Sequence, residues 1–242
     1  MSTLLSPRTH AAKFAVIALL IFHAVLPRVS ASALTWDITP ANGASITDGA
    51  GDWLNGAGNW NTGSGDATWM NATPDSAIFG SGGTAGTVTL TGAITAGGLT
   101  FNAVTGSYTV TGNTLTLSGS PTIAVNDDAA TINSTLAGTT ITKAGTGTLT
   151  LGGVNSYTGL TTVSTGTLQI TSLSALGTTA AGTTVSNGAM LDISAAGTIT
   201  GETLTLNGAG IGGNGALVVN SNGAWSGAVT ASTASRSASP AA

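Results

Sequence analysis

The residues that could carry chemistry are few in this sequence. Asp127 and Asp128 are its only adjacent acidic pair, and Lys143 is the only cation between the N-terminal segment and Arg236. A carboxylate with a basic partner can act in acid and base catalysis, so an acid-dependent polysaccharide enzyme is one hypothesis. Consecutive strand residues point to opposite faces, however, and aspartates after a strand are typical of turns. We therefore expect this pair to cap backbone amides, and we expect no catalytic residue.

Imidazole and thiol groups are missing from the segment expected to fold. The chain has no cysteine, and both histidines, His10 and His23, lie near the N-terminus. Catalytic triads and structural zinc sites depend on these groups. The aspartates between residues 48 and 75 could offer oxygen ligands to calcium, but their spacing matches no calcium-binding loop. The sequence predicts no metal site and no cofactor.

Tryptophans offer the other candidate chemistry. Trp53, Trp60 and Trp69 are separated by segments rich in Gly, Asn and Asp. Flat exposed indoles stack on sugar faces, which makes these residues candidate glycan contacts of a carbohydrate-binding module. The alternative is an N-terminal cap, which a solenoid needs to cover the open end of its core. We favour the cap.

The first 33 residues predict a signal peptide. Arg8 and Lys13 precede an apolar run over Phe14–Leu26, and small residues follow up to Ala33. The run is shorter than the ~20 residues that span a bilayer, so we expect no membrane span in the mature chain. Cleavage after Ala33 or Ala31 leaves two cations against nine acidic residues, a net charge of about −7. Nucleic acid and anionic membranes are poor partners for that charge.

From Thr84 onward the sequence predicts β-strands. Short alternating runs are divided by glycine, which contributes 36 residues to the chain, while charged residues make up only 6%. Alternation with period two is typical of strands with one buried face. The residues expected to point inward are Val88, Leu90, Leu99, Phe101, Tyr108, Val110, Leu115, Leu117, Ile123 and Val125.

One glycine- and threonine-rich phrase recurs along these strands. Its leading leucines are Leu115, Leu149, Leu168 and Leu204, separated by 34, 19 and 36 residues. A unit near the low end of the range for solenoids, or about twice that unit, fits these gaps. Turn asparagines are expected to stack between rungs as amide ladders, namely Asn102, Asn113, Asn155 and Asn207.

The most complete copy has three parts, which read Lys-x-Gly-x-Gly-x-Leu-x-Leu, Asn-x-Tyr-Thr-Gly and Thr-Thr-Val-x-x-Gly-x-Leu. Its residues are Lys143, Gly145, Gly147, Leu149, Leu151, Asn155, Tyr157, Thr158, Gly159, Thr161, Thr162, Val163, Gly166 and Leu168. This unit resembles the autotransporter-associated β-strand repeat, also called the passenger-associated transport repeat. The tryptophan-rich start also looks like the N-terminal region of large secreted proteins that carry this repeat.

The resemblance implies a right-handed parallel β-helix that is exported across the cell envelope. It implies no catalytic residues, and it suggests a solvated or stacking role for Lys143. Because one full unit is present, we expect a fragment of a longer passenger or a short relative of one. The sequence thus predicts an all-β protein with a signal peptide at 1–33, a tryptophan-rich cap at 34–83, solenoid repeats at 84–230 and a disordered or truncated tail at 231–242.

The expected function is structural. We expect a secreted or surface-exposed stalk segment, located outside the cell, with adhesion through outer rung faces or loops as a further role. Surface polysaccharide or a neighbouring cell-surface protein would then be the partner. The carbohydrate-binding module with its N-terminal tryptophans is the alternative.

Overall fold

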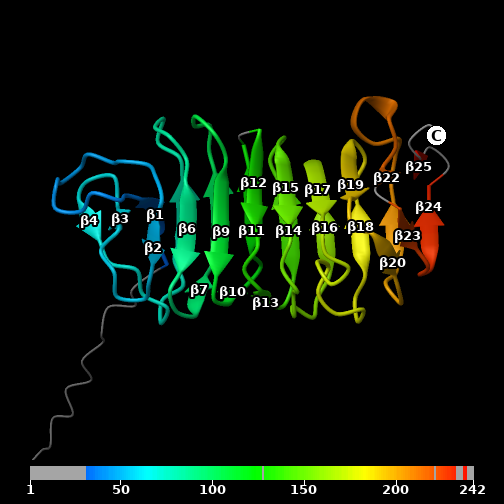
Figure 1. The fold of residues 1–242 in the computed structure, drawn as a ribbon, viewed down its shortest axis with the longest axis horizontal. Coiled ribbons are helices and arrows are strands. Elements are labelled where there is room, and N and C mark those ends of the chain that lie inside the picture. The colour runs from blue at the N-terminus through cyan, green and yellow to red at the C-terminus, as the bar shows by residue number, and fades with distance from the viewer. Residues whose placement is uncertain (1–30, 127, 221, 233–236, 239–242) are drawn as a thin grey trace, which may run out of the picture.

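The computed structural model describes residues 31–126, 128–220, 222–232 and 237–238, and it shows a parallel β-solenoid. Strands from successive turns lie side by side along the long axis (Figure 1). The architecture confirms the predicted all-β solenoid. The predicted signal peptide lies almost wholly outside the described residues.

Two long sheets form the main faces of the solenoid. The first contains, in chain order, β1 (Ala33–Trp36), β3 (Trp60–Asn61), β4 (Asp66–Ala67), β5 (Ser76–Phe79), β8 (Gly98–Phe101), β11 (Thr122–Val125), β14 (Ile141–Ala144), β16 (Thr161–Val163), β18 (Thr183–Val185), β21 (Leu204–Leu206) and β24 (Val229–Ala231). The second contains β2 (Gly51–Trp53), β6 (Thr87–Leu90), β9 (Tyr108–Gly112), β12 (Ala129–Ile132), β15 (Thr148–Leu151), β17 (Gly166–Ile170), β19 (Ala189–Ile193), β22 (Leu217–Val219) and β25 (Ser237–Ala238).

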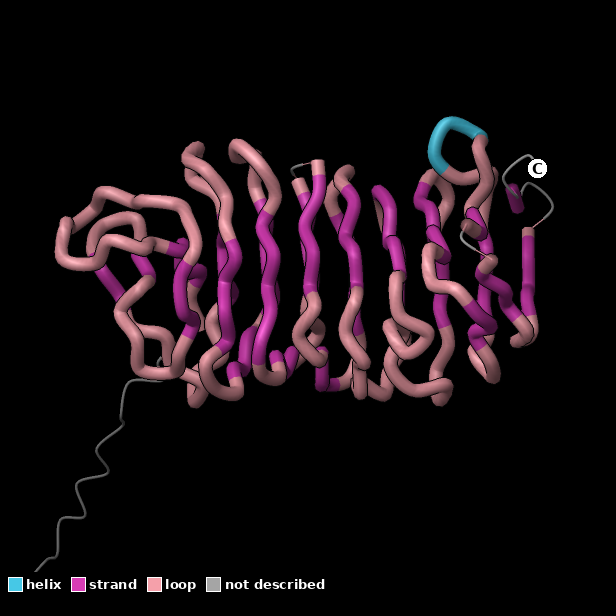
Figure 2. The backbone as a smooth tube through the Cα atoms, in the orientation of Figure 1, coloured by secondary structure: helices cyan, strands magenta, loops and turns pink. Residues whose placement is uncertain are grey.

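A third side is only partly built from strands. Near the cap it is a sheet of β7 (Ile94–Ala96), β10 (Leu115–Leu117) and β13 (Leu136–Gly138), and near the other end it is the pair β20 (Gly197–Ile199) and β23 (Gly223–Trp225). Between these two groups the chain crosses this side as loops (Figure 2). A short 3-10 turn, Ile211–Gly213, projects from the far end of the second sheet.

Each turn of the solenoid returns the chain to register on the previous turn. The first turns, at the cap, are longer: Ala33 pairs with Ser76 and Gly51 pairs with Val88, 43 and 37 residues on. From β5 onward a rung takes between 19 and 26 residues, as the pairs Thr148 with Thr167 and Leu191 with Leu217 show. Alternate side chains point inward because successive residues of a strand face opposite sides. All ten residues predicted to point inward are buried, none more than 1% exposed.

The recurring leucine phrase does not mark one face. Leu149 and Leu168 are paired neighbours in the second sheet. Leu115, by contrast, begins β10 on the third side, and Leu204 begins β21 in the first sheet. The uneven spacing of the phrase therefore reflects its use on different sides of the solenoid.

The N-terminal end departs from the parallel pattern. β1 pairs in parallel with β5 but antiparallel with β3, and β3 pairs antiparallel with β4. This small antiparallel extension covers the first edge of the first sheet, where a parallel rung would otherwise be open.

The predicted tail at 231–242 lies mostly outside the described residues. Within the described part, Ala231 ends β24, and Ser237 pairs with Leu217 of β22. No helix in the described part of the chain is long and apolar enough to cross a membrane.

Candidate functional site

The candidate glycan contacts lie inside the N-terminal cap. Trp53, Trp60 and Trp69 are each fully buried. The ring of Trp60 lies 4.9 Å from that of Trp53 and 4.6 Å from that of Trp69, and Phe79 of β5 is 5.8 Å away. Stacking on a sugar needs an open indole face, and none of the three offers one. The structure therefore does not support the carbohydrate-binding alternative.

Asp48 ties the cap to the first rungs. Its carboxylate accepts hydrogen bonds from the Ser81 and Gly83 amides, both at 2.8 Å, and from the Tyr108 hydroxyl at 2.9 Å. Burial alone would raise the pKa of Asp48, but these hydrogen bonds to the ionised form outweigh it and lower the pKa. Burial also raises the pKa of Tyr108, so its hydroxyl stays a donor at neutral pH.

We expect Tyr108→Phe to lower the free energy of unfolding by about 1.5 kcal/mol, because it removes a hydrogen bond to a charged group. The measurement is urea unfolding at pH 7. Thr109→Val, on the outer face of the same strand, is the control and should change stability by less than about 0.5 kcal/mol. Equal effects of the two substitutions would contradict a specific role for the hydroxyl.

Lys143 is buried, so of the two roles expected for it, a solvated or a stacking side chain, the solvated one was wrong. Its Nζ donates to the carbonyl oxygens of Ala144 and Gly145, both at 2.9 Å, and of Thr165 at 3.1 Å. The three donors of an ammonium group are thus matched by three backbone acceptors. Lys143 lies on β14 and Thr165 just before β17, so the side chain ties two successive rungs together. Burial lowers the pKa of Lys143 to about 8.

Two motif glycines make this arrangement possible. Gly145 has φ of 75° and Gly166 has φ of 67°, values that side chains other than glycine rarely adopt. A Cβ atom on Gly145 would run into the carbonyl oxygen of Val125 on the previous rung. A Cβ atom on Gly166 would run into the Gly145 and Gly147 carbonyl oxygens and lie 2.8 Å from the Lys143 ammonium. The repeat needs glycine here because backbone and lysine fill the space.

Asn155 replaces a strand on the third side of the solenoid. Its side-chain oxygen accepts a hydrogen bond from the Leu136 amide of β13 at 2.8 Å, and its side-chain nitrogen donates to the Ala175 carbonyl at 2.6 Å. One amide side chain therefore continues the ladder where the backbone forms a loop. Tyr157 lies next to it, fully buried, with its hydroxyl 2.7 Å from the Thr161 hydroxyl.

The remaining motif residues stack in the core or pair between turns. The leucines of β15 and β17 are all buried, namely Leu149, Leu151 and Leu168. Backbone amides of the motif donate to carbonyls of the previous rung, namely those of Gly147, Thr158 and Gly159. The structure thus brings the whole motif together as two adjacent rungs.

The predicted amide ladder is only partly present. Asn126 donates to the side chain of Asn102 at 3.1 Å, so this pair is a true amide contact between rungs. Asn113 and Asn207 donate instead to backbone carbonyls of the preceding rung, at 2.9 and 3.2 Å. Turn asparagines therefore stabilise the stacking mainly through the backbone.

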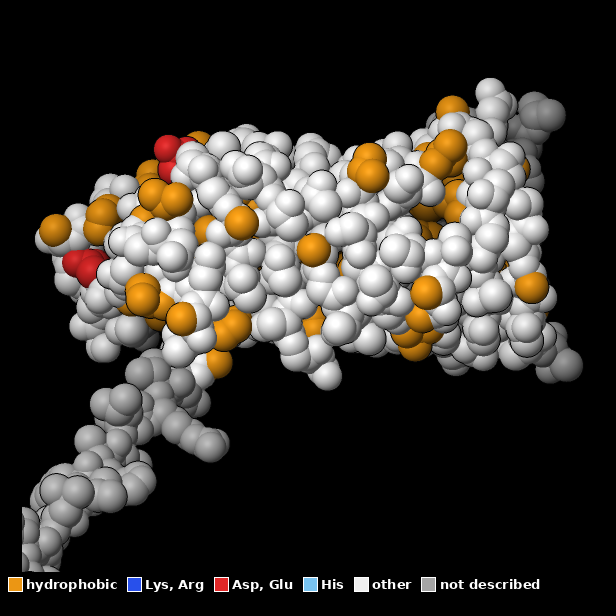
Figure 3. Space-filling view, turned by 90° about the horizontal axis from the view of Figure 1, so that it is seen from below, with side chains coloured by type: hydrophobic (Ala, Val, Ile, Leu, Met, Phe, Trp, Pro, Cys, Tyr) orange, Lys and Arg blue, Asp and Glu red, His pale blue; other side chains and the backbone are white. Residues whose placement is uncertain are grey.

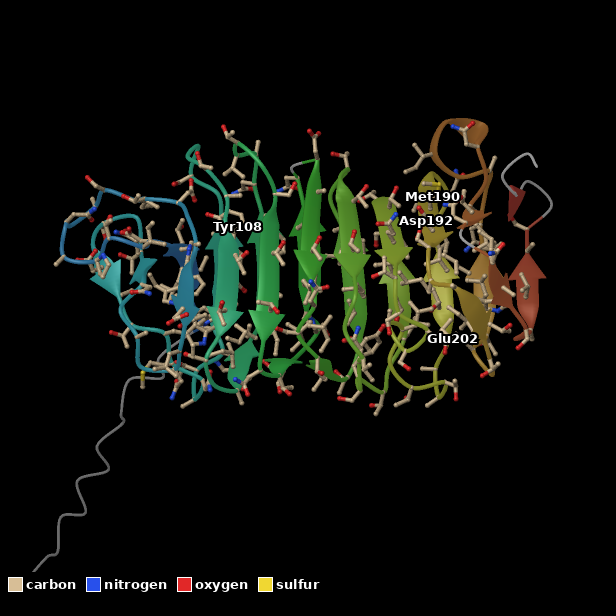
Figure 4. The ribbon with its side chains drawn as sticks, in the orientation of Figure 1. Tyr108, Met190, Asp192 and Glu202 are labelled. Atoms are coloured by element: carbon tan, nitrogen blue, oxygen red, sulfur yellow. The ribbon has the colours of Figure 1, made fainter. Side chains whose placement is uncertain are left out.

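An outer polar cluster escaped the sequence analysis. Gln169 and Asp192 are paired positions of β17 and β19, and the Gln169 amide donates to the Asp192 carboxylate at 3.1 Å. Ser194 and Asn220 also donate to Asp192, both at 2.9 Å. Asp192 and Met190 alternate with the buried residues of β19 (Figure 4). The alternation of that strand was the signal that could have placed them on the outer face.

Glu202 is a second residue that sequence reasoning missed. It is buried just before β21 and accepts a hydrogen bond from the Thr183 hydroxyl at 3.0 Å (Figure 4). Burial raises the pKa of this carboxyl group. Nothing in the local sequence distinguishes it from an exposed turn residue.

The described surroundings of the acidic pair contain no basic side chain that could serve as its catalytic partner. Asp127 lies outside the described residues, and Asp128 lines a shallow, open pocket of about 290 Å³ beside Asn126 and Thr148. The bond found at Asp128 comes from the Thr148 amide to its backbone carbonyl, at 2.9 Å, rather than from a turn amide to its carboxylate. Within the described ranges, no three His, Cys, Asp or Glu residues are grouped to hold a metal ion.

The outer surface carries very little charge. On the face in Figure 3, acidic side chains gather at the cap end and no lysine or arginine is visible. Among described residues, Lys143 is the only lysine or arginine, and it is buried. Hydroxyl, amide and small apolar groups therefore make up most of the surface along the rungs.

Comparison with known proteins agrees with this architecture. Residues 141–170 match the family described as the passenger-associated-transport-repeat. The adhesin BmaC autotransporter of Brucella suis biovar 1 (strain 1330) is 42% identical over 196 residues, which cover 77% of this chain and 6% of that protein. The chain thus spans a small fraction of that relative's length, and no solved structure matches it significantly. The chain is an exported protein that carries the passenger-associated transport repeat.

Proposed function

We propose that the rungs form a stalk or spacer within a surface passenger. We further propose that the transport repeat is the segment of this spacer that side-chain hydrogen bonds between rungs stabilise most. The carrying observation is the unbroken parallel ladder from β5 to β24, with Lys143 and Asn155 joining neighbouring rungs in its middle. A ladder of this kind gains length with each rung while each rung contacts only its neighbours.

Adhesion is a further part of the proposal. The relative named above is an adhesin, and the outer faces here present hydroxyl and amide groups with almost no charge. Such a surface fits surface polysaccharide or a neighbouring cell-surface protein better than a strongly charged partner. The buried tryptophans take no part in this contact.

We also propose that the chain is not an enzyme. The pocket beside Asp128 offers one carboxylate, one amide and two hydroxyl side chains, from Asp128, Asn126, Thr146 and Thr148. Lys143 is the one lysine or arginine among the described residues, and its ammonium group donates to backbone carbonyls. Acid and base catalysis needs a group that can reach a substrate proton.

Deletion of whole rungs tests the spacer role. Thr183 pairs with Leu204, so removing residues 183–203 takes out one turn and keeps the register of the rest. We expect the shortened passenger, fused to a translocator and an epitope tag, to reach the cell surface as well as the parent. Removing only residues 183–192 breaks the register and should abolish surface display.

The same assay separates the spacer from the transport repeat. Ile141 pairs with Thr161, so removing residues 141–160 also takes out one turn, but it removes Lys143 and Asn155 as well. We expect the deletion of residues 141–160 to reduce surface display several-fold, and the deletion of residues 183–203 to leave it unchanged. Loss of display with both in-register deletions would contradict the spacer role, and full display with the out-of-register deletion would show that no folded ladder is required.

A further inference from the structure

Asp75 holds a buried carboxyl group that contacts one of the first described residues. It is 7% exposed, and its Oδ1 accepts a hydrogen bond from the Ser32 backbone nitrogen at 2.6 Å. A buried carboxylate is costly unless a cation or several donors face it. The only lysine or arginine in the described part of the chain is Lys143, whose ammonium group is bonded to carbonyl oxygens on other rungs.

Ser32 also takes part in the backbone ladder. The Ser76 amide donates to the Ser32 carbonyl at 2.8 Å, and Ala33 is paired with Ser76. Among the described residues, Leu34 is the first whose side chain enters the core. Ser32 therefore supplies two backbone contacts that hold the first strand to β5.

Two candidate cleavage positions place an alanine directly before the cut. Cleavage after Ala33 places Ala31 at the third position before the cut, and cleavage after Ala31 places Val29 there. The first removes Ser32 and leaves the Asp75 carboxylate buried without its donor. The second keeps both contacts of Ser32 and converts its amide nitrogen into an α-ammonium group.

We propose that an export-pathway peptidase cleaves between Ala31 and Ser32, and that the new α-ammonium of Ser32 forms an ion pair with Asp75 that anchors the N-terminal strand. Hydrolysis adds water across the peptide bond: Ala31 leaves as a carboxylate and the Ser32 nitrogen takes up a proton. The junction is accessible, since Ala31 and Ser32 are both exposed, while the acceptor is buried. The cleavage position is independent of what the outer rung faces bind.

The first test is the identity of the mature N-terminus. The full chain is exported from a bacterial host with its own leader, and the product is analysed by intact mass and N-terminal sequencing. We expect a chain that begins at Ser32. A chain that begins at Leu34, or that keeps residues before Ser32, overturns the proposal.

The second test isolates the ammonium group. Asp75→Asn keeps the shape and an acceptor oxygen but removes the charge, and it is compared in a chain that begins at Ser32 and in one extended by Ala31. With the Ser32 start, we expect the folding constant from urea unfolding to fall about tenfold. With the extension, where Ser32 offers only an amide, we expect a fall of at most about twofold.

Asp66→Asn is the matched control. Asp66 also accepts a backbone amide hydrogen bond, from Ala41 at 2.7 Å, but it lies on the exposed side of the cap. Its effect should be the same in both chains. An equal effect of Asp75→Asn in both chains would show that the ammonium contributes nothing, even if cleavage occurs at Ser32.

Discussion

Gly145→Ala is expected to lower the free energy of unfolding by about 3 to 4 kcal/mol. The left-handed φ of 75° costs an alanine about 1 to 2 kcal/mol. The added Cβ would also overlap the Val125 carbonyl oxygen, which accepts the Gly147 amide at 2.9 Å. Relief of the overlap must move one of the two rungs and weaken that hydrogen bond, so we expect a further loss of about 2 kcal/mol. Urea unfolding of the purified chain at pH 7 measures the sum.

Gly119→Ala separates the two contributions. Gly119 has nearly the same φ, 74°, but a Cβ atom there would have nothing within 4 Å. We expect this control to lose only about 1 to 2 kcal/mol. Similar losses of unfolding free energy at the two positions would mean that the backbone conformation alone explains why residue 145 is glycine. The close approach of the rungs in the transport repeat would then contribute nothing.

The strands and their inward residues could be predicted because alternation is a local property. Val110 and Ile123 point inward in the structure as their sequence neighbours indicate, and the same rule would have put Gln169 and Asp192 outside. The side of the solenoid on which a strand lies is not local. Leu115 and Leu204 begin nearly identical phrases but belong to different sheets, because loop length decides which side the chain has reached.

The polar contacts of the candidate site depend on the neighbouring rung, so the sequence could not predict them. Lys143 was expected to be solvated or to stack, since lysine is almost never buried without a partner. Its partners are backbone carbonyls. Every residue has a backbone carbonyl, so the residue types in the sequence do not indicate where these acceptors lie. The role of Asn155 is hidden in the same way, since its bond to the Leu136 amide replaces a strand that the loop does not form.

The tryptophans illustrate a different difficulty. Their spacing fits both an exposed sugar platform and a buried cap, because both need large flat rings near one end. What decides is the antiparallel extension of β3 and β4, which folds Trp60 against Trp53 and Trp69. That extension is two very short strands, and their pairing has no pattern that a periodicity analysis would detect.

Lys143 should give the chain an unusual alkaline stability profile. Its pKa is about 8 in the folded chain and 10.5 when unfolded, so between these values the unfolded chain binds a proton that the folded chain does not. The unfolding free energy therefore rises with pH, and we expect a gain of about 2 kcal/mol between pH 7 and pH 9.5. Urea unfolding at several pH values within this window measures it.

Lys143→Met is the control, because a thioether side chain of similar length cannot titrate. The difference in unfolding free energy between parent and Lys143→Met should change by about 2 kcal/mol across the same window, in favour of the parent. Above pH 10 the tyrosines act in the opposite direction, since burial raises the pKa of Tyr108 and Tyr157 and the unfolded chain loses those protons first. A difference that stays constant from pH 7 to pH 9.5 would mean that the three carbonyl oxygens solvate the ammonium as well as water does. Lys143 would then hold the rungs together as a permanent charge.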